Sequence, residues 1–244
     1  MMKHLKTFVS VLALLAVVSC AKTPSAGSGQ VSFKVSSNQQ VADMTKSNVS
    51  DYAVNPSAED FSIVVTGPEE YRWNGKITDW NPETILLEGE YSVTANYGDL
   101  EDEGFNKPFF TGTQDFTING GETTEVSIPV KLGNTIVKIA CSEYFQKYFT
   151  DYTFKLSRTG YEIATISKDE TRAVFVDGYM VTLSGTLTSE SKTYQFSKSY
   201  SDLSPATAYT FMLDVSNVGG SAITITFKDG YSETVDLGVH ELND

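Results

Sequence analysis

The architecture of the chain is set by one stretch in its first half, Leu87-Glu88-Gly89-Glu90-Tyr91-Ser92-Val93-Thr94-Ala95-Asn96-Tyr97-Gly98-Asp99. From Tyr91 to Tyr97, apolar side chains alternate with serine, threonine and asparagine, so one face of a strand is apolar and the other is polar. Gly89 precedes this strand and Gly98-Asp99 follows it, and both are typical turn residues. The stretch predicts a β-strand that buries one face.

Similar alternating segments lie on both sides of this strand. The turn Asn119-Gly120-Gly121-Glu122 joins two of them into an antiparallel meander. The polar residues 36–59 indicate a long loop or a crossover between sheets. With about seven strands in about 100 residues, the first half predicts a two-sheet sandwich. The other strands are expected at residues 31–35, 61–65, 71–75, 84–87, 115–118 and 123–130.

The second half repeats this pattern after a boundary at Leu132-Gly133-Asn134. Ser142 can cap a short helix over residues 143–149, and Asp229-Gly230 is a strong hairpin signal. We therefore predict an all-β protein of two tandem antiparallel β-sandwich domains, residues 30–133 and 134–244, with one short helix. Strands of the second domain are expected at residues 137–141, 152–156, 163–166, 174–176, 179–187, 194–196, 209–215, 223–227 and 235–237.

The first 20 residues predict a lipoprotein signal peptide and not a part of the fold. Lys3 and Lys6 form a positive segment, and the apolar run after them is too short to span a bilayer as a mature helix. The run ends in small residues before Cys20, the pattern of a cysteine that becomes the acylated first residue. The alternative is an ordinary secretory signal with a chance cysteine. Residues 21–29 predict a flexible linker between this lipid anchor and the first domain.

The composition limits the chemistry of the chain. It has 18 Lys and Arg against 31 Asp and Glu, a formal net charge of −13 at pH 7, so a nucleic-acid partner is not expected. Once the signal peptide is removed and Cys20 is acylated, His240 and Cys141 are the only histidine and free thiol. Catalytic triads and Cys/His zinc sites cannot be assembled from them, and the sequence has no phosphate-binding loop. We expect no cofactor and no enzymatic activity, with Cys141 as a small core residue.

Two groups of residues could still bind a ligand. Tyr71, Trp73 and Trp80 interleave with amide side chains, and aromatic platforms of this kind can hold a sugar, whereas the alternative is that the tryptophans plug the sandwich. A run of acidic residues could hold calcium through carboxylate oxygens, whereas the alternative is a solvated loop. We favour the alternative in both cases. The acidic residues are Asp99, Glu101, Asp102 and Glu103.

Several motifs together carry a family pattern. They are the stretch from Gly89 to Asp99, Pro108-Phe109-Phe110-Thr111-Gly112, Phe116-Thr117-Ile118, Gly121-Glu122-Thr123-Thr124, and the junction from Leu132 to Ile139. This pattern resembles the fimbrillin-like surface lipoproteins of Bacteroidales. The resemblance implies tandem transthyretin-like or immunoglobulin-like sandwiches of Greek-key type and a cell-surface, adhesive role. Fimbrillins are thought to polymerise after a protease cuts behind an arginine near the first strand, and this chain has no arginine before Arg72.

Three functions remain open at this point. The first is a cell-adhesion or fimbria-related binding or structural protein, lipid-anchored in the outer membrane and facing the cell surface. The second is a glycan-binding accessory lipoprotein of a polysaccharide-uptake system, and an enzyme ranks last. The expected partners are the membrane, through the lipid anchor, and a protein or glycan at the cell surface. We expect the isolated protein to be a monomer with its first strand in place.

Overall fold

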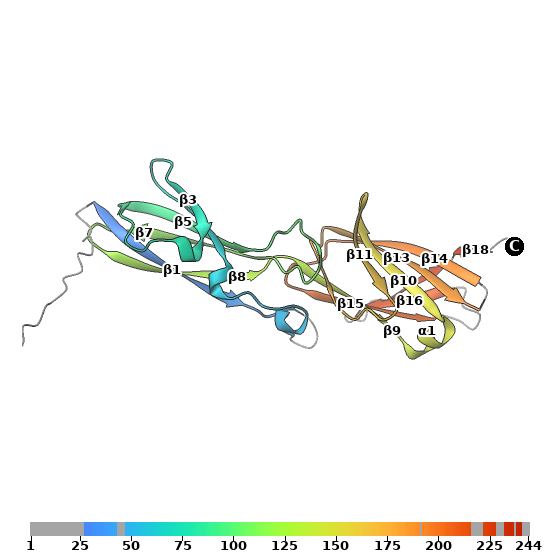
Figure 1. Cartoon of the computed structure of the whole chain (residues 1–244). Helices are drawn as coiled ribbons and strands as arrows, with labels where there is room; N and C mark the ends of the chain where they lie inside the picture. The colour runs from blue at the N-terminus through green and yellow to red at the C-terminus, as the bar shows by residue number, and fades with distance from the viewer. Residues whose placement is uncertain are drawn as a thin grey trace, which may run out of the picture.

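The computed structural model describes residues 27–42, 47–190, 192–215, 222–227, 232–236 and 238–240. These residues form eighteen strands, one α-helix and three short 3-10 helices, which confirms the all-β fold class. Two β-structured halves lie end to end, so that the start of the first strand and the last strand, β18, lie at opposite ends of an elongated molecule (Figure 1). The predicted signal peptide, Cys20 and residues 21–26 of the predicted linker lie outside the described residues, as does the turn at Asp229-Gly230.

The first half consists of strands β1 to β8, of which β6 joins a sheet of the second half. The other seven form one sheet in the order β3-β2-β5-β7-β8-β1-β4. The alternating stretch is its strand β5, which pairs antiparallel with β2 and β7. The bounds are β1 Ser28–Asn38, β2 Ser62–Thr66, β3 Arg72–Lys76, β4 Leu86–Leu87, β5 Gly89–Tyr97, β6 Gly104–Phe105, β7 Phe110–Ile118 and β8 Thr123–Leu132, with 3-10 helices at Val49–Asp51, Ala58–Asp60 and Ile77–Asp79.

The seven-stranded sheet turns a corner between β7 and β8. These strands pair only at one end, where Phe110 lies opposite Leu132 and Thr111 opposite Lys131. Gly112 follows directly, and a Cβ atom there would lie 1.9 Å from the Pro129 carbonyl oxygen, so only glycine fits this approach. The two arms of the sheet therefore face each other. Their buried side chains include Val31, Ile63, Val65, Val93, Ala95, Phe110, Ile118, Ile128 and Leu132.

Strand β1 lies inside this sheet and begins within the predicted linker, at Ser28. It runs parallel to β8, from Gln30 opposite Thr123 to Asn38 opposite Lys131, whereas an antiparallel sandwich was expected. Local alternation carries no information on the direction of a partner that is more than 90 residues away in the chain. Over this length β1 is an integral strand of the sheet.

The second half contains two sheets that face each other. One has the order β11-β10-β13-β14-β18, and the other has the order β17-β16-β15-β9-β12-β6. Its first strand, β9, again lies parallel to a late strand, β15. The bounds are β9 Thr135–Cys141, β10 Asp151–Arg158, β11 Tyr161–Ser167, β12 Val174–Val176, β13 Met180–Ser189, β14 Lys192–Ser201, β15 Ala208–Val215, β16 Ala222–Phe227, β17 Ser232–Asp236 and β18 Gly238–His240.

The predicted short helix is confirmed as α1, Glu143–Tyr148. The Ser142 hydroxyl caps it by accepting a hydrogen bond from the Phe145 N–H at 3.0 Å. Phe145 and Phe149 are fully buried, with ring centroids 4.8 Å apart, and they pack on the core between the two sheets. The other large side chains of this core are Phe154, Leu156, Val181, Leu183, Leu187, Phe211 and Leu213.

The two halves are joined by more than the chain at residue 133. Strand β6 leaves the first half and pairs with β12, with Val174 opposite Phe105. Ala42, in the long loop after β1, makes an isolated bridge to Thr207. The hydrophobic core of the first half also contains Ile136 and Phe175 from the second half. The domain boundary at residues 133 and 134 stays a prediction, because strands and core residues cross it.

Candidate functional site

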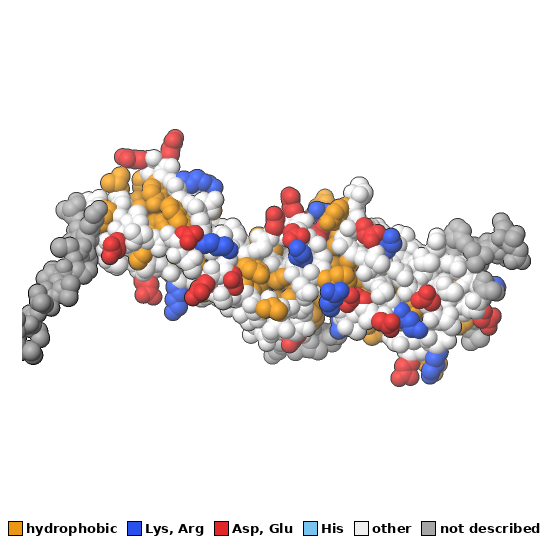
Figure 2. All heavy atoms as spheres, in the orientation of Figure 1, with side chains coloured by type: hydrophobic (Ala, Val, Ile, Leu, Met, Phe, Trp, Pro, Cys, Tyr) orange, Lys and Arg blue, Asp and Glu red, His pale blue; other side chains and the backbone are white. Residues whose placement is uncertain are grey.

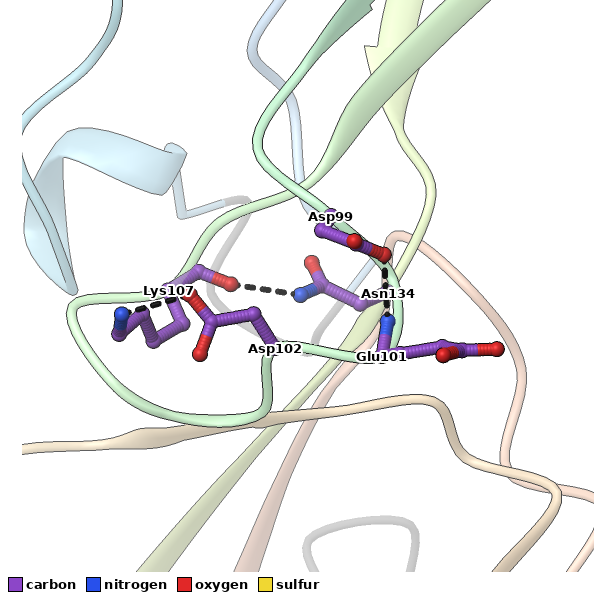
Figure 3. Close-up of polar contacts among 5 residues, drawn as sticks. All are labelled: Asp99, Glu101, Asp102, Lys107 and Asn134. Carbon is purple, nitrogen blue, oxygen red and sulfur yellow. Dashed lines mark hydrogen bonds and ion pairs between the residues drawn. The ribbon is translucent and has the colours of Figure 1, made fainter.

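The acidic loop at residues 98–109 spans the junction between the two halves (Figure 3). Asp99 Oδ1 accepts a hydrogen bond from the Glu101 N–H at 3.0 Å, and Asp102 Oδ2 pairs with Lys107 Nζ at 2.6 Å. Asn134 then fixes the end of the loop, because its Nδ2 donates to the Lys107 carbonyl oxygen at 2.8 Å. These contacts attach the loop to the start of β9.

The four acidic residues of this loop do not converge. Asp99 caps its own turn, Glu101 is exposed, and Asp102 is an exposed ion-pair partner. Glu103 points into the second half instead. No group of three or more His, Cys, Asp or Glu side chains that could hold a metal ion is found in the described part of the chain. The structure therefore offers no calcium cage at the residues that the sequence singled out.

Glu103 is the buried acid of the junction, with 2% of its side chain exposed. Its Oε1 accepts a hydrogen bond from the Asp177 N–H at 2.8 Å, and its Oε2 lies 3.1 Å from Arg158 Nε. Burial raises the pKa of this carboxyl above its ordinary value, and the Asp177 N–H and the Arg158 charge oppose that rise. One side chain of the first half thus holds a backbone turn and an arginine of the second.

A small hollow of about 170 Å³ opens beside this ion pair. We call it the junction pocket, and its lining residues are Glu103, Arg158, Thr159, Asp177, Tyr179 and Met180. They come from the acidic loop, from the β10–β11 hairpin and from the segment before and at the start of β13. Tyr179 is 77% exposed and Met180 38%, and Tyr161, whose ring centroid is 5.7 Å from Arg158 Cζ, is 50% exposed. Figure 2 shows hydrophobic side chains among acidic and basic ones near the middle of the molecule.

A second arginine stabilises the other side of the β6 connection. Arg172 lies over the ring of Phe105, with 4.4 Å between its Cζ and the ring centroid. The same guanidinium donates to both carboxylate oxygens of Glu170, at 3.0 and 2.6 Å, and these bonds lower the pKa of Glu170 to about 2. The Arg172 guanidinium, which Glu170 holds in place, therefore packs on the Phe105 ring.

The three aromatic residues predicted from the sequence lie in the first half, away from the junction pocket. Trp80 is buried, and its indole N–H donates to the Val31 carbonyl oxygen of β1 at 2.9 Å. Its ring packs edge-on against Phe33 and Trp73, at centroid distances of 5.0 and 5.1 Å. Trp80 thus belongs to the core and has no exposed face for stacking on a sugar. Tyr71 and Trp73 are half-buried, and a ligand-binding role for them stays a prediction.

The remaining reactive groups do not form a site in the described residues. Burial raises the pKa of the Cys141 thiol to about 12, which keeps it protonated and unreactive at neutral pH. His240 belongs to β18, where only its backbone pairing, opposite Thr193, is described. No described helix has both the length and the apolar character needed to cross a membrane.

Sequence reasoning missed Arg158, Asp177 and Tyr179. Arg158 and Asp177 lie between predicted strands and Tyr179 begins one, and no motif connects them with Glu103, which is more than 50 residues earlier in the chain. No local signal in the sequence marks these residues. Their proximity to Glu103 follows from the fold, in which Arg158 contacts Glu103 and Asp177 follows the strand that pairs with β6.

The comparisons with known proteins identify a family. A family model described as "Domain of unknown function (DUF4493)" matches residues 27–239, which include both halves. No curated protein matches the chain.

Similar solved structures include a fimbrial assembly protein from Parabacteroides distasonis, at 9% identity and a TM-score of 0.46 over 85% of this chain and 98% of the other. A "putative cell adhesion protein" from Bacteroides eggerthii is 10% identical, with a TM-score of 0.43 over 90% and 96%. One of the "putative polysaccharide binding proteins (DUF1812)" from Bacteroides thetaiotaomicron is 11% identical, with a TM-score of 0.40 over 89% and 98%. Identities and TM-scores this low do not support a transfer of function.

Proposed function

The chain belongs to the DUF4493 family, and we propose that it is a lipid-anchored cell-envelope protein with an adhesive or fimbria-related binding role and no catalytic activity. The anchor in this proposal is Cys20, acylated after removal of residues 1–19. The placement is the outer membrane, facing the cell surface, as the fimbrillin-like sequence pattern implies.

The observation that carries the proposal is the end-to-end arrangement of the two halves. The first described residues enter β1 at one end of the molecule, and β18 lies at the other (Figure 1). An anchor on the segment before β1 would therefore hold the first half near the membrane and present the second half farther out. This is the geometry that a display or adhesion protein needs.

The contacts at the junction support the same role. Glu103, the β6–β12 pairing and the Ala42–Thr207 bridge all cross between the halves. Several independent connections resist bending better than a single linker, because each must break before the halves can swing apart. A stiff rod keeps a distal binding surface at a fixed distance from the membrane.

The position of β1 supports a monomer. This strand pairs along its length with β8, and its Val31 carbonyl oxygen accepts a hydrogen bond from the Trp80 indole N–H. Release of β1 would therefore break the core of the first half. Light scattering of the protein that starts at Ala21, before and after mild trypsin, tests the idea. Trypsin can cut at Lys34 and Lys46, and we expect a monomer in both samples. Ladder-like oligomers in either sample would place the protein among the polymerising pilins instead.

The alternative function is a glycan-binding accessory lipoprotein of a polysaccharide-uptake system. The observation that favours it is the junction pocket, where two exposed tyrosines stand beside a fixed arginine and two carboxylates. The two functions share a binding role at the cell surface and differ in the partner. Hydrolysis of a glycan or peptide by the pure protein, abolished by a single carboxylate substitution, would contradict both.

The anchor and the adhesive role are tested in cells that produce the full chain or its Cys20→Ala variant. We expect an acyl label on the wild type only, digestion of the wild type by protease added to intact cells, and attachment of these cells to a host or bacterial surface. The Cys20→Ala cells should lose the label and the attachment. Equal labelling of both proteins would refute the anchor, and equal attachment by cells that lack the protein would refute the adhesive role.

A further inference from the structure

The junction pocket combines hydrogen-bond donors and acceptors in one small hollow. Arg158 is oriented by the contact of its Nε with Glu103, and its two Nη atoms have no hydrogen-bond partner among the described residues. Asp177 donates its backbone N–H to Glu103, and its half-buried carboxylate also has no hydrogen-bond partner in that set. A guanidinium fork and a carboxylate, both with free hydrogen-bonding capacity, therefore line the same pocket.

The rim of the pocket is aromatic and exposed. Tyr179 is 77% exposed and Tyr161 50%, and the Arg158 guanidinium lies over the Tyr161 ring. Exposed tyrosine rings present apolar faces to water while their hydroxyl groups stay polar. A ligand with an apolar C–H face and polar edges would cover these rings and gain from their burial.

The charges around the pocket select against ions. The pair formed by Glu103 and Arg158 is neutral, and Asp177 adds a negative charge in a chain whose net charge is −13. An anionic ligand would be repelled by Asp177 and by the chain as a whole, and a cation would meet Arg158. A neutral ligand rich in hydroxyl groups can use the donors of Arg158 and the acceptors of Asp177 at once.

The size of the pocket points to one ring and not to a long chain. Its volume of about 170 Å³ is smaller than the roughly 300–1,000 Å³ of pockets that enclose drug-sized ligands. We infer that the junction pocket binds one neutral sugar unit of a surface glycan, with the ring against Tyr179 or Tyr161 and its hydroxyl groups on Arg158 and Asp177. This inference rests on the proposed binding function and names its ligand class.

Both halves of the molecule are needed for this site. Glu103 belongs to the loop between β5 and β6, whereas Arg158, Asp177 and Tyr179 belong to the second half. Without Glu103, Arg158 would lose the contact that orients its guanidinium. The sugar site therefore exists only while the junction is closed, and a bound sugar would in turn stabilise the closed junction.

The test uses the full chain in detergent and a panel of neutral gluco-, manno-, galacto- and xylo-oligosaccharides, with uronic-acid oligomers beside them. Affinities are measured by calorimetry or on an array. We expect at least one neutral oligosaccharide to bind, about tenfold weaker binding by Tyr179→Ala, and a comparable loss in Arg158→Lys, which keeps the charge and removes the fork. The matched control is Tyr144→Ala, which removes a tyrosine that is 74% exposed on α1, and it should bind like the wild type.

Several results would overturn the inference. They are the absence of binding to every neutral oligosaccharide, preferential binding of the uronic acids, or equal binding by the wild type and Tyr179→Ala. Attachment of cells that carry Tyr179→Ala separates this inference from the proposed function. If such cells attach as the wild type does while cells without the protein do not, the adhesive role stands and the sugar site fails. If cells without the protein attach equally well, the adhesive role fails on its own.

Discussion

In the first half β1 runs parallel to β8, and in the second half β9 runs parallel to β15, so each half opens with a strand that a much later strand joins. The surroundings of the two pairs differ. The first half bends one continuous sheet at the β7–β8 corner, whereas the second half places two separate sheets against each other. The same pairing of early and late strands is thus compatible with two ways of closing a core.

The cores of the two halves also differ in where their residues come from. The core of the second half, around Phe145 and Phe154, consists of buried residues from Val137 onward. The core of the first half includes Ile136 and Phe175, which belong to strands of the second half. The fully buried core of the second half therefore uses only its own residues, with Phe105 of β6 packed against it, whereas the buried core of the first half is completed by its neighbour.

Two buried phenylalanines provide the strongest way to break this comparison. Phe175→Ala and Phe154→Ala each remove a ring that is at most 1% exposed, so each should lower the free energy of unfolding by about 3–5 kcal/mol. The chain has two tryptophans, Trp73 and Trp80, and both lie in the first half, so their fluorescence reports the unfolding of that half. Phe175→Ala should shift the fluorescence transition in urea to lower concentration.

Phe154→Ala is the matched control in the same experiment. It should shift the transition seen by far-ultraviolet circular dichroism to lower urea concentration. The fluorescence transition, which reports the first half, should not occur at a lower urea concentration than the unfolding of the second half. If both variants move the fluorescence transition by the same amount, the halves unfold as one unit and the asymmetry between their cores has no energetic consequence.

The sequence predicted the elements whose signals are local. The alternation from Tyr91 to Tyr97 identified β5, and Ser142 identified the start of α1. The two-residue strand β6 was not predicted, because two residues cannot show a period, whereas β4 lies within the strand expected at residues 84–87. The parallel β1–β8 pairing is likewise invisible, since alternation fixes which face is buried and not which strand lies alongside.

The candidate site was harder to predict than the fold. Glu103 stands in an acidic run, and such runs are usually solvated, so its sequence neighbours argue against burial. The Asp177 N–H and the Arg158 guanidinium pair with it, and the β6–β12 contact brings Asp177 there while Arg158 reaches it from the other sheet. The sequence neighbours of Trp80 also differ from its position in the fold. Its polar neighbours suggested a sugar platform, whereas its indole N–H is used to hold β1.

The corner of the first half gives the next largest effect. A Cβ atom at Gly112 would lie 1.9 Å from the Pro129 carbonyl oxygen, so Gly112→Ala must move backbone and should destabilise the protein by about 1–3 kcal/mol. The counterpart in the second half is Gly185, where the nearest atoms to the added Cβ belong to the Phe196 ring, at 2.2 Å and beyond. A side chain can move aside more easily than backbone. Thermal unfolding should therefore show a smaller loss for Gly185→Ala, and the opposite order would contradict the special role of the corner.

The hydrogen bond between Trp80 and β1 gives a smaller effect. Trp80→Phe keeps an aromatic ring in the core but removes the donor to the Val31 carbonyl oxygen, which should lower the free energy of unfolding by about 1–2 kcal/mol. Trp73→Phe is the control, because the Trp73 indole N–H has no hydrogen-bond partner in the described part of the chain. Urea denaturation followed by circular dichroism compares them. An equal loss in both variants would show that ring size, and not this hydrogen bond, sets the stability of β1.

The smallest effect concerns the pH dependence of the junction. Burial raises the pKa of Glu103 above its ordinary value of 4.5, so the folded protein keeps this proton to a higher pH than the unfolded chain does. By linkage, the contribution of Glu103 to stability is complete below pH 4.5 and falls as the pH rises through the raised pKa. The stability of the wild type relative to Glu103→Gln should therefore decrease between pH 4.5 and pH 7, by a small amount because Arg158 and the Asp177 N–H offset the burial.

The pH dependence contributed by Glu170 has the opposite sign, because Arg172 lowers the pKa of Glu170 to about 2. Relative to Glu170→Gln, the wild type should lose stability only as the pH falls below about 5. Urea denaturation at pH values from about 3.5 to 7.5 covers both trends. If the stability of the wild type relative to Glu103→Gln instead increases as the pH rises, the partners of the junction carboxylate stabilise its charged form more strongly than burial opposes it.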